Sequence, residues 1–107
     1  MDLKHYILDA DHHLVEVDLL TWGRWLEESR AARIVDRTDL ADGISVSTVF
    51  IGIDHRFHGS GPPLVFETMV FGGALDGEMW RYSSWDDAVA GHAAAVRKAR
   101  KSTATAS

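Results

Sequence analysis

Apolar and polar residues alternate through the middle of the chain with the period of two that is typical of β-strands. The strongest strand predictions are residues 44–51, which follow an Asp42-Gly43 turn, and residues 64–71, which follow two prolines and are apolar apart from Glu67 and Thr68. Shorter runs predict further strands at residues 6–8, 14–17, 33–38 and 78–82. Because these segments follow one another closely along the chain, they should pair in a mainly antiparallel way.

Two other segments repeat their apolar residues every three or four positions, which predicts helices. The first, over residues 19–30, follows Asp18, a residue that commonly caps a helix N-terminus. The second, over residues 85–100, follows Ser84 and carries His92 on its apolar stripe, where we expect a buried, hydrogen-bonded histidine. The pattern therefore predicts an α+β fold, with a mainly antiparallel sheet of about 4–6 strands and two helices packed on one face.

The alternation also places apolar residues on both faces of the sheet. Val46 and Phe50 point to one side of their strand, whereas Val49 and Ile51 point to the other. Two short helices can cover only one face of a small sheet. We therefore expect a second copy of the chain on the other face, and predict a homo-oligomer.

The length of 107 residues provides one hydrophobic core. We expect a single domain over residues 1–101 and a disordered tail of small polar residues over 102–107. The N-terminus lacks an apolar leader, and no stretch approaches the roughly 20 apolar residues of a membrane span. The chain contains no cysteine, which suits a reducing cytoplasm.

The net charge of −5 argues against long nucleic acids as partners, because they favour basic surfaces. A small nucleotide remains compatible with this charge, since one or two arginines can neutralise its phosphates. The sequence has no nucleophile elbow, no phosphate-binding P-loop and no His-Glu-x-x-His zinc motif. We therefore predict a protein that has no catalytic residues and needs no cofactor.

The densest group of chemically versatile residues is the loop at 54–61, between two of the strongest strands. It offers His55 and Arg56 for polar and phosphate contacts and Phe57 for stacking. The Asp-His-x-x-His spacing inside it is too common to predict a metal site. A solvated connection between two strands is the alternative interpretation of this loop.

Glu67 is a carboxylate inside an otherwise apolar strand, so it must face solvent, bind a ligand or pair with a cation. Arg81, on the next predicted strand, is the expected cross-strand partner. The functional alternative is that Glu67 or Thr68 contacts a base edge or a ribose hydroxyl. Thr48 is expected to supply a further polar contact. Trp80 and Tyr82 share one face of their strand and are expected in the core, with stacking on a ligand as the alternative.

Four segments carry a resemblance to known proteins that covers nearly the whole chain. They are residues 46–55 (VSTVFIGIDH), 62–73 (PPLVFETMVFGG), 81–85 and 90–92. With these segments the chain resembles a widespread family of small phage and prophage proteins, and FETMVFGG is the most specific part. It is similar in this way to the phage anti-CBASS sponges. Those proteins assemble as oligomers and sequester cyclic dinucleotide immune signals without cleaving them. The resemblance implies a phage-encoded protein in the host cell cytosol.

The leading hypothesis is an immune-evasion protein that binds and sequesters a small cyclic nucleotide at the junctions of an oligomer. The ligand-binding residues predicted from this sequence are Thr48, His55, Arg56, Phe57, Glu67 and Arg81. One alternative is an anti-defence inhibitor that binds another protein through its acidic surface. A second is a small phosphodiesterase that uses His55 and Glu67 for acid–base chemistry.

Overall fold

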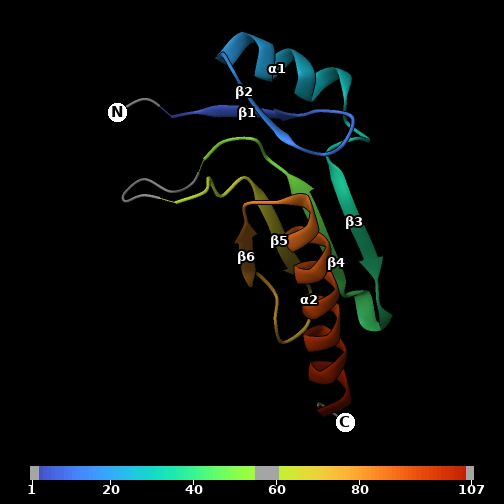
Figure 1. The fold of residues 1–107 in the computed structure, drawn as a ribbon. Helices are drawn as coiled ribbons and strands as arrows, with labels where there is room; N and C mark the ends of the chain where they lie inside the picture. The colour runs from blue at the N-terminus through green and yellow to red at the C-terminus, as the bar shows by residue number, and fades with distance from the viewer. Residues whose placement is uncertain (1–2, 55–60, 106–107) are drawn as a thin grey trace.

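The computed structural model describes residues 3–54 and 61–105, and Figure 1 shows how they are arranged. In chain order the elements are β1 (His5–Leu8), β2 (Leu14–Val17), α1 (Leu19–Glu28), β3 (Ile34–Asp39), η1 (Ala41–Gly43), β4 (Ser45–Phe50), β5 (Phe66–Phe71), β6 (Met79–Tyr82) and α2 (Trp85–Thr105). The pairs that these strands make are all antiparallel. The predicted α+β class and antiparallel pairing are confirmed.

The strands form two sheets, which the alternation pattern did not separate. β3 to β6 make a four-stranded meander in chain order, and β1 pairs with β2 as a separate hairpin. Asp42 and Gly43 connect β3 to β4 with positive φ angles of 64° and 73°. Glycine takes this conformation without steric cost, which explains its place in the predicted turn. A bulge interrupts β3 between Ile34 and Asp36.

α2 lies along one face of the four-stranded sheet (Figure 1). The apolar residues that it buries are mostly small, namely Ala88, Ala95, Val96 and Ala99. Their size lets the helix backbone come close to the strands. The approach is close at Gly91, where a Cβ atom would overlap the ring of Tyr82 on β6.

A second group of core residues joins the hairpin and α1 to the sheet. At its centre is Phe50, which is fully buried. The ring centroid of Phe50 lies 5.1 Å from that of Phe66 and 5.6 Å from that of Trp25, whose ring it meets edge to face. α1 itself has no fully buried residue, and a hydrogen bond of 3.3 Å from Trp22 Nε1 to the carbonyl oxygen of Ile51 helps to hold it.

Both predicted helix caps are confirmed. The Asp18 carboxylate accepts from the backbone N–H of Thr21 at 2.7 Å, and the Ser84 hydroxyl accepts from that of Asp87 at 3.1 Å. α2 then continues to Thr105, so residues 102–105 are helical where we expected a tail; residues 106–107 lie outside the described part. Among the described helices, none has the length and apolar character needed to cross a membrane.

Candidate functional site

A polar network lies between α2 and the sheet and includes one residue predicted to bind a ligand. Thr48 on β4 is fully buried, and its Oγ1 atom lies 2.7 Å from Nδ1 of His92 and 2.5 Å from Oγ1 of Thr68 on β5. The other ring nitrogen of His92, Nε2, lies 2.9 Å from Oγ1 of Thr38 on β3. His92 on α2 is thus a buried histidine with hydrogen-bond partners, as the sequence predicts.

This network gives Thr48 a structural role. Its hydroxyl is engaged by two buried side chains, and no part of the residue is exposed to a ligand. A buried imidazole left without a partner costs about 1–3 kcal/mol, and Thr48 removes that cost for one nitrogen of His92. The sequence identifies Thr48 as polar, but whether a threonine in a strand meets solvent or a helix depends on which face the helix covers.

Burial lowers the pKa of His92, because the charged imidazolium loses its hydration between α2 and the sheet. The carboxylate of Asp36, with Oδ2 3.7 Å from Nε2, acts in the opposite direction but less strongly. The Asp36 side chain is 59% exposed, so solvent weakens its effect. His92 is therefore held in its neutral form near neutral pH.

We expect the free energy of unfolding to fall as the pH drops below the ordinary histidine value of 6.5. In that range His92 is protonated in the unfolded chain but stays largely neutral in the folded chain. The unfolded state therefore binds more protons and becomes more favoured as the pH falls. Chemical denaturation followed at a series of pH values measures this slope. His92→Gln should flatten this slope just below pH 6.5. Asp9 and Asp18, whose pKa values are lowered, affect stability only at more acidic pH. An unchanged slope in His92→Gln would assign the effect to other groups.

Glu67 and Arg81 lie on the other face of the sheet, directly opposite each other in the register of β5 and β6. Arg81 Nε donates to Glu67 Oε2 at 3.3 Å, which confirms the predicted cross-strand pair. The side chains remain partly exposed, Glu67 at 19% and Arg81 at 34%. The structure therefore separates two groups of predicted site residues, since Thr48 faces α2 and this pair faces away from it.

We call the side of the four-stranded sheet away from α2 the open face. The register places these residues on it: Ile34, Arg37, Ser47, Val49, Glu67, Met69, Phe71, Met79 and Arg81. Several of its apolar side chains are strongly exposed, with 52% for Ile34, 46% for Phe71 and 41% for Met79. The open face thus combines flat apolar surface with ion-paired arginine, the mixture that suits a ligand or a partner chain.

The other predicted contacts, His55, Arg56 and Phe57, lie outside the described residues. The segments on either side of them are well anchored. Asp54 accepts from the backbone N–H of Leu64 at 3.0 Å, and its own N–H donates to the carbonyl oxygen of Lys4 at 3.3 Å. The loop therefore starts beside the N-terminal hairpin.

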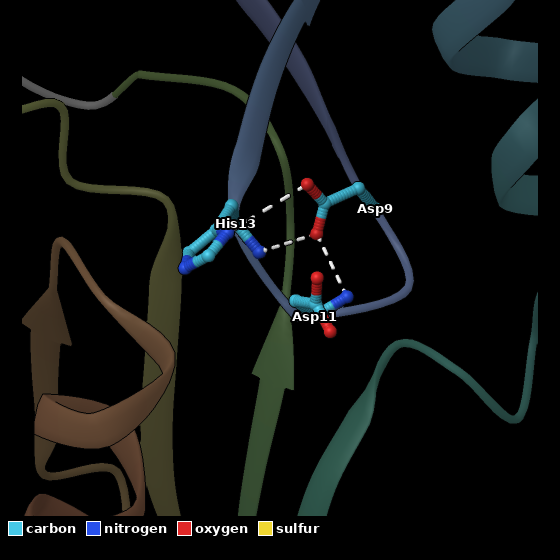
Figure 2. A group of neighbouring side chains, drawn as sticks. All are labelled: Asp9, Asp11 and His13. Carbon is cyan, nitrogen blue, oxygen red and sulfur yellow. Dashed lines mark hydrogen bonds and ion pairs between the residues drawn. The ribbon is translucent and has the colours of Figure 1, made fainter.

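The turn of that hairpin brings Asp9, Asp11 and His13 together (Figure 2). One potential metal-ligand atom from each lies within 4.8 Å of the others, and all three residues are exposed. Asp9 Oδ1 accepts from the backbone N–H groups of Asp11 and His13, each at 2.9 Å. The hydrogen bond from His13 is the main reason why the pKa of Asp9 is lowered. The group has ligands for a divalent cation, but its hydrogen bonds are those of a turn. The sequence signal for the group is the Asp-x-Asp-x-His spacing.

A hollow of about 290 Å³ separates this turn from the N-terminus of α2. On its wall the ring of His12 stacks on Trp85, with 3.6 Å between centroids and 9° between planes. His12 adopts a positive φ of 65° to reach this position. Asp11 and Asp86 also line the hollow, so it disfavours a phosphate.

No protein-family model, curated protein or solved structure matches this chain.

Proposed function

We propose that this protein binds a small cyclic nucleotide and sequesters it without cleavage. The resemblance to phage sponges supports the ligand class. The observation that carries the proposal is the position of the Glu67–Arg81 pair on the open face, among exposed apolar side chains. The Arg81 guanidinium can exchange part of its contact with Glu67 for a ligand phosphate, while Met79 or Phe71 covers a base.

A single flat face can cover only one side of such a ligand. Binding sites for small molecules usually enclose most of the ligand surface, which a four-stranded sheet alone does not achieve. A second copy laid on the open face would enclose the ligand and cover the exposed Ile34, Phe71 and Met79 at the same time. The proposed oligomer and the proposed ligand site therefore share one surface.

We expect the purified protein, incubated with a panel of cyclic di- and trinucleotides, to deplete one of them from solution and to release it intact on heating. Chromatography of the solution before and after heat denaturation measures both steps. Arg81→Gln should weaken retention by about ten-fold or more, since a hydrogen bond to a charged group is lost. Arg97→Gln, at an exposed position of α2, is the matched control and should retain the nucleotide as the wild type does.

Each other outcome has a definite meaning. Nucleotide degraded during incubation would contradict sequestration and favour the phosphodiesterase alternative, with His55→Ala as the next variant. No depletion across the panel would contradict the proposal and favour a protein-binding inhibitor. Retention that Arg81→Gln leaves unchanged would remove the open face from the site.

A further inference from the structure

A second hollow, of about 430 Å³, lies where α1 ends and β3 begins. Five residues line it: Leu26, Glu27, Arg30, Arg33 and Ile34. Two of the five carry a guanidinium group, and two provide apolar walls. None of them belongs to the polar network or to the Glu67–Arg81 pair. The hollow is large enough for more than a single water molecule.

Arg33 is the unusual member of this group. Its Nε atom is buried, and among the described residues no hydrogen-bond partner reaches it. Buried polar atoms of folded proteins nearly always have a partner, which can be a bound ion or water. An arginine N–H is a donor only, so the missing partner must be an acceptor.

The backbone holds Arg33 firmly at this place. Its carbonyl oxygen accepts from the N–H of Phe50 on β4 at 2.7 Å, and its own N–H donates to the carbonyl oxygen of Ser29 at 3.2 Å. The residue is thus tied both to the sheet and to the end of α1. These bonds fix the backbone from which the Arg33 side chain extends.

The presence of an arginine at position 30 can be explained without a ligand, because a cation just after a helix complements the negative end of the helix dipole. That explanation does not extend to the buried Nε of Arg33. Together the two guanidinium groups offer several donors around one space, the arrangement that matches the oxygens of a phosphate. Glu27 on the same wall opposes an anion and moderates its affinity.

We propose that this hollow is a binding site for a phosphate group, in which Arg33 Nε and the Arg30 guanidinium donate to the phosphate oxygens. The phosphate can be free or part of a nucleotide. Ile34 connects the site to the open face, since it lies in one register row with Val49, Glu67 and Arg81. The inference rests on the hollow itself; where the proposed function also holds, it adds a second phosphate contact at the β3 edge of that face.

Arginine Nε–Hε signals in NMR spectra of the ¹⁵N-labelled protein test the site directly, with inorganic phosphate as the probe. We expect the Arg33 signal, assigned by its loss in Arg33→Lys, to shift saturably. Arg33→Gln should weaken phosphate binding by about ten-fold. Glu27→Gln should strengthen it several-fold, and Arg24→Gln, an exposed arginine of α1 outside the hollow, should leave it unchanged.

An Arg33 signal in the wild type that does not respond to phosphate would overturn the proposal, whether or not the variants fold. Equal affinities of wild type and Arg33→Gln would also overturn it. A cyclic nucleotide that is retained without moving the Arg33 signal supports the proposed function but excludes this hollow from it. A phosphate response without retention of any nucleotide supports the site and contradicts the proposed function.

Discussion

Phe50→Ala is expected to lower the free energy of unfolding by about 3–5 kcal/mol, the usual cost of removing a buried phenylalanine ring. Phe50 is fully buried and contacts both Phe66 and Trp25. The ring therefore fills the space between β4, β5 and α1, and the cavity left by alanine is bounded by elements that cannot all move inward. Because the free energy of unfolding of a small domain is about 5–15 kcal/mol in total, this substitution should remove much of the stability.

Urea denaturation followed by tryptophan fluorescence measures this loss, and Trp25 beside the cavity should report it. Phe71→Ala is the matched control, because Phe71 is 46% exposed on the open face. In dilute protein we expect this substitution to cost less than about 1 kcal/mol. Equal losses for the two variants would contradict the placement of Phe50 at the centre of the core.

Gly91→Ala is expected to destabilise the protein by about 1–3 kcal/mol, although alanine is ordinarily the better helix former. The added methyl group would overlap the ring of Tyr82, which is packed between β6 and α2. To remove this overlap, either α2 must move away from the sheet or the ring of Tyr82 must leave its packed position. Thermal unfolding of the variant measures the net effect.

Gly23→Ala in α1 makes the same chemical change in a different setting. No atom lies within 4 Å of the position that its Cβ would take among the described residues. Helix propensity alone should then raise the stability by about 0.5–1 kcal/mol. The two glycines are thus predicted to respond with opposite signs, and a stabilising effect at Gly91 would show that α2 is not so close to β6.

Much of the fold follows from local pattern. The strands of the meander were predicted from runs of β-branched and aromatic residues bounded by turn signals. The starts of the helices were predicted from Asp18 and Ser84, and the Glu67–Arg81 pair from one carboxylate in an apolar strand. His92 was recognised as buried because it interrupts an apolar helical stripe. Each of these features depends on residues close in sequence or on neighbouring strands.

Features that depend on how distant elements meet were not predictable in this way. The sequence does not show that β1 and β2 form their own sheet, because the alternation of a hairpin is the same in either arrangement. It does not show that Thr48 meets His92, since the two are joined only by the packing of α2. Arg33 was not identified as a site residue, because the burial of its Nε depends on how the folded chain packs around it and not on the local sequence pattern.

The polar network has a consequence for how α2 finds its place. A stripe made mostly of alanine presents nearly the same surface after a shift of one helical turn, so apolar burial alone distinguishes poorly between alignments. His92 removes this degeneracy, because only one alignment gives both of its nitrogens a threonine partner from the strands below. We infer that His92 selects one alignment of α2 on the sheet, although the rest of the apolar stripe is repetitive. A redesigned interface with leucine and valine in place of His92, Thr48 and Thr68 could match the stability of the present one and still lose its single alignment.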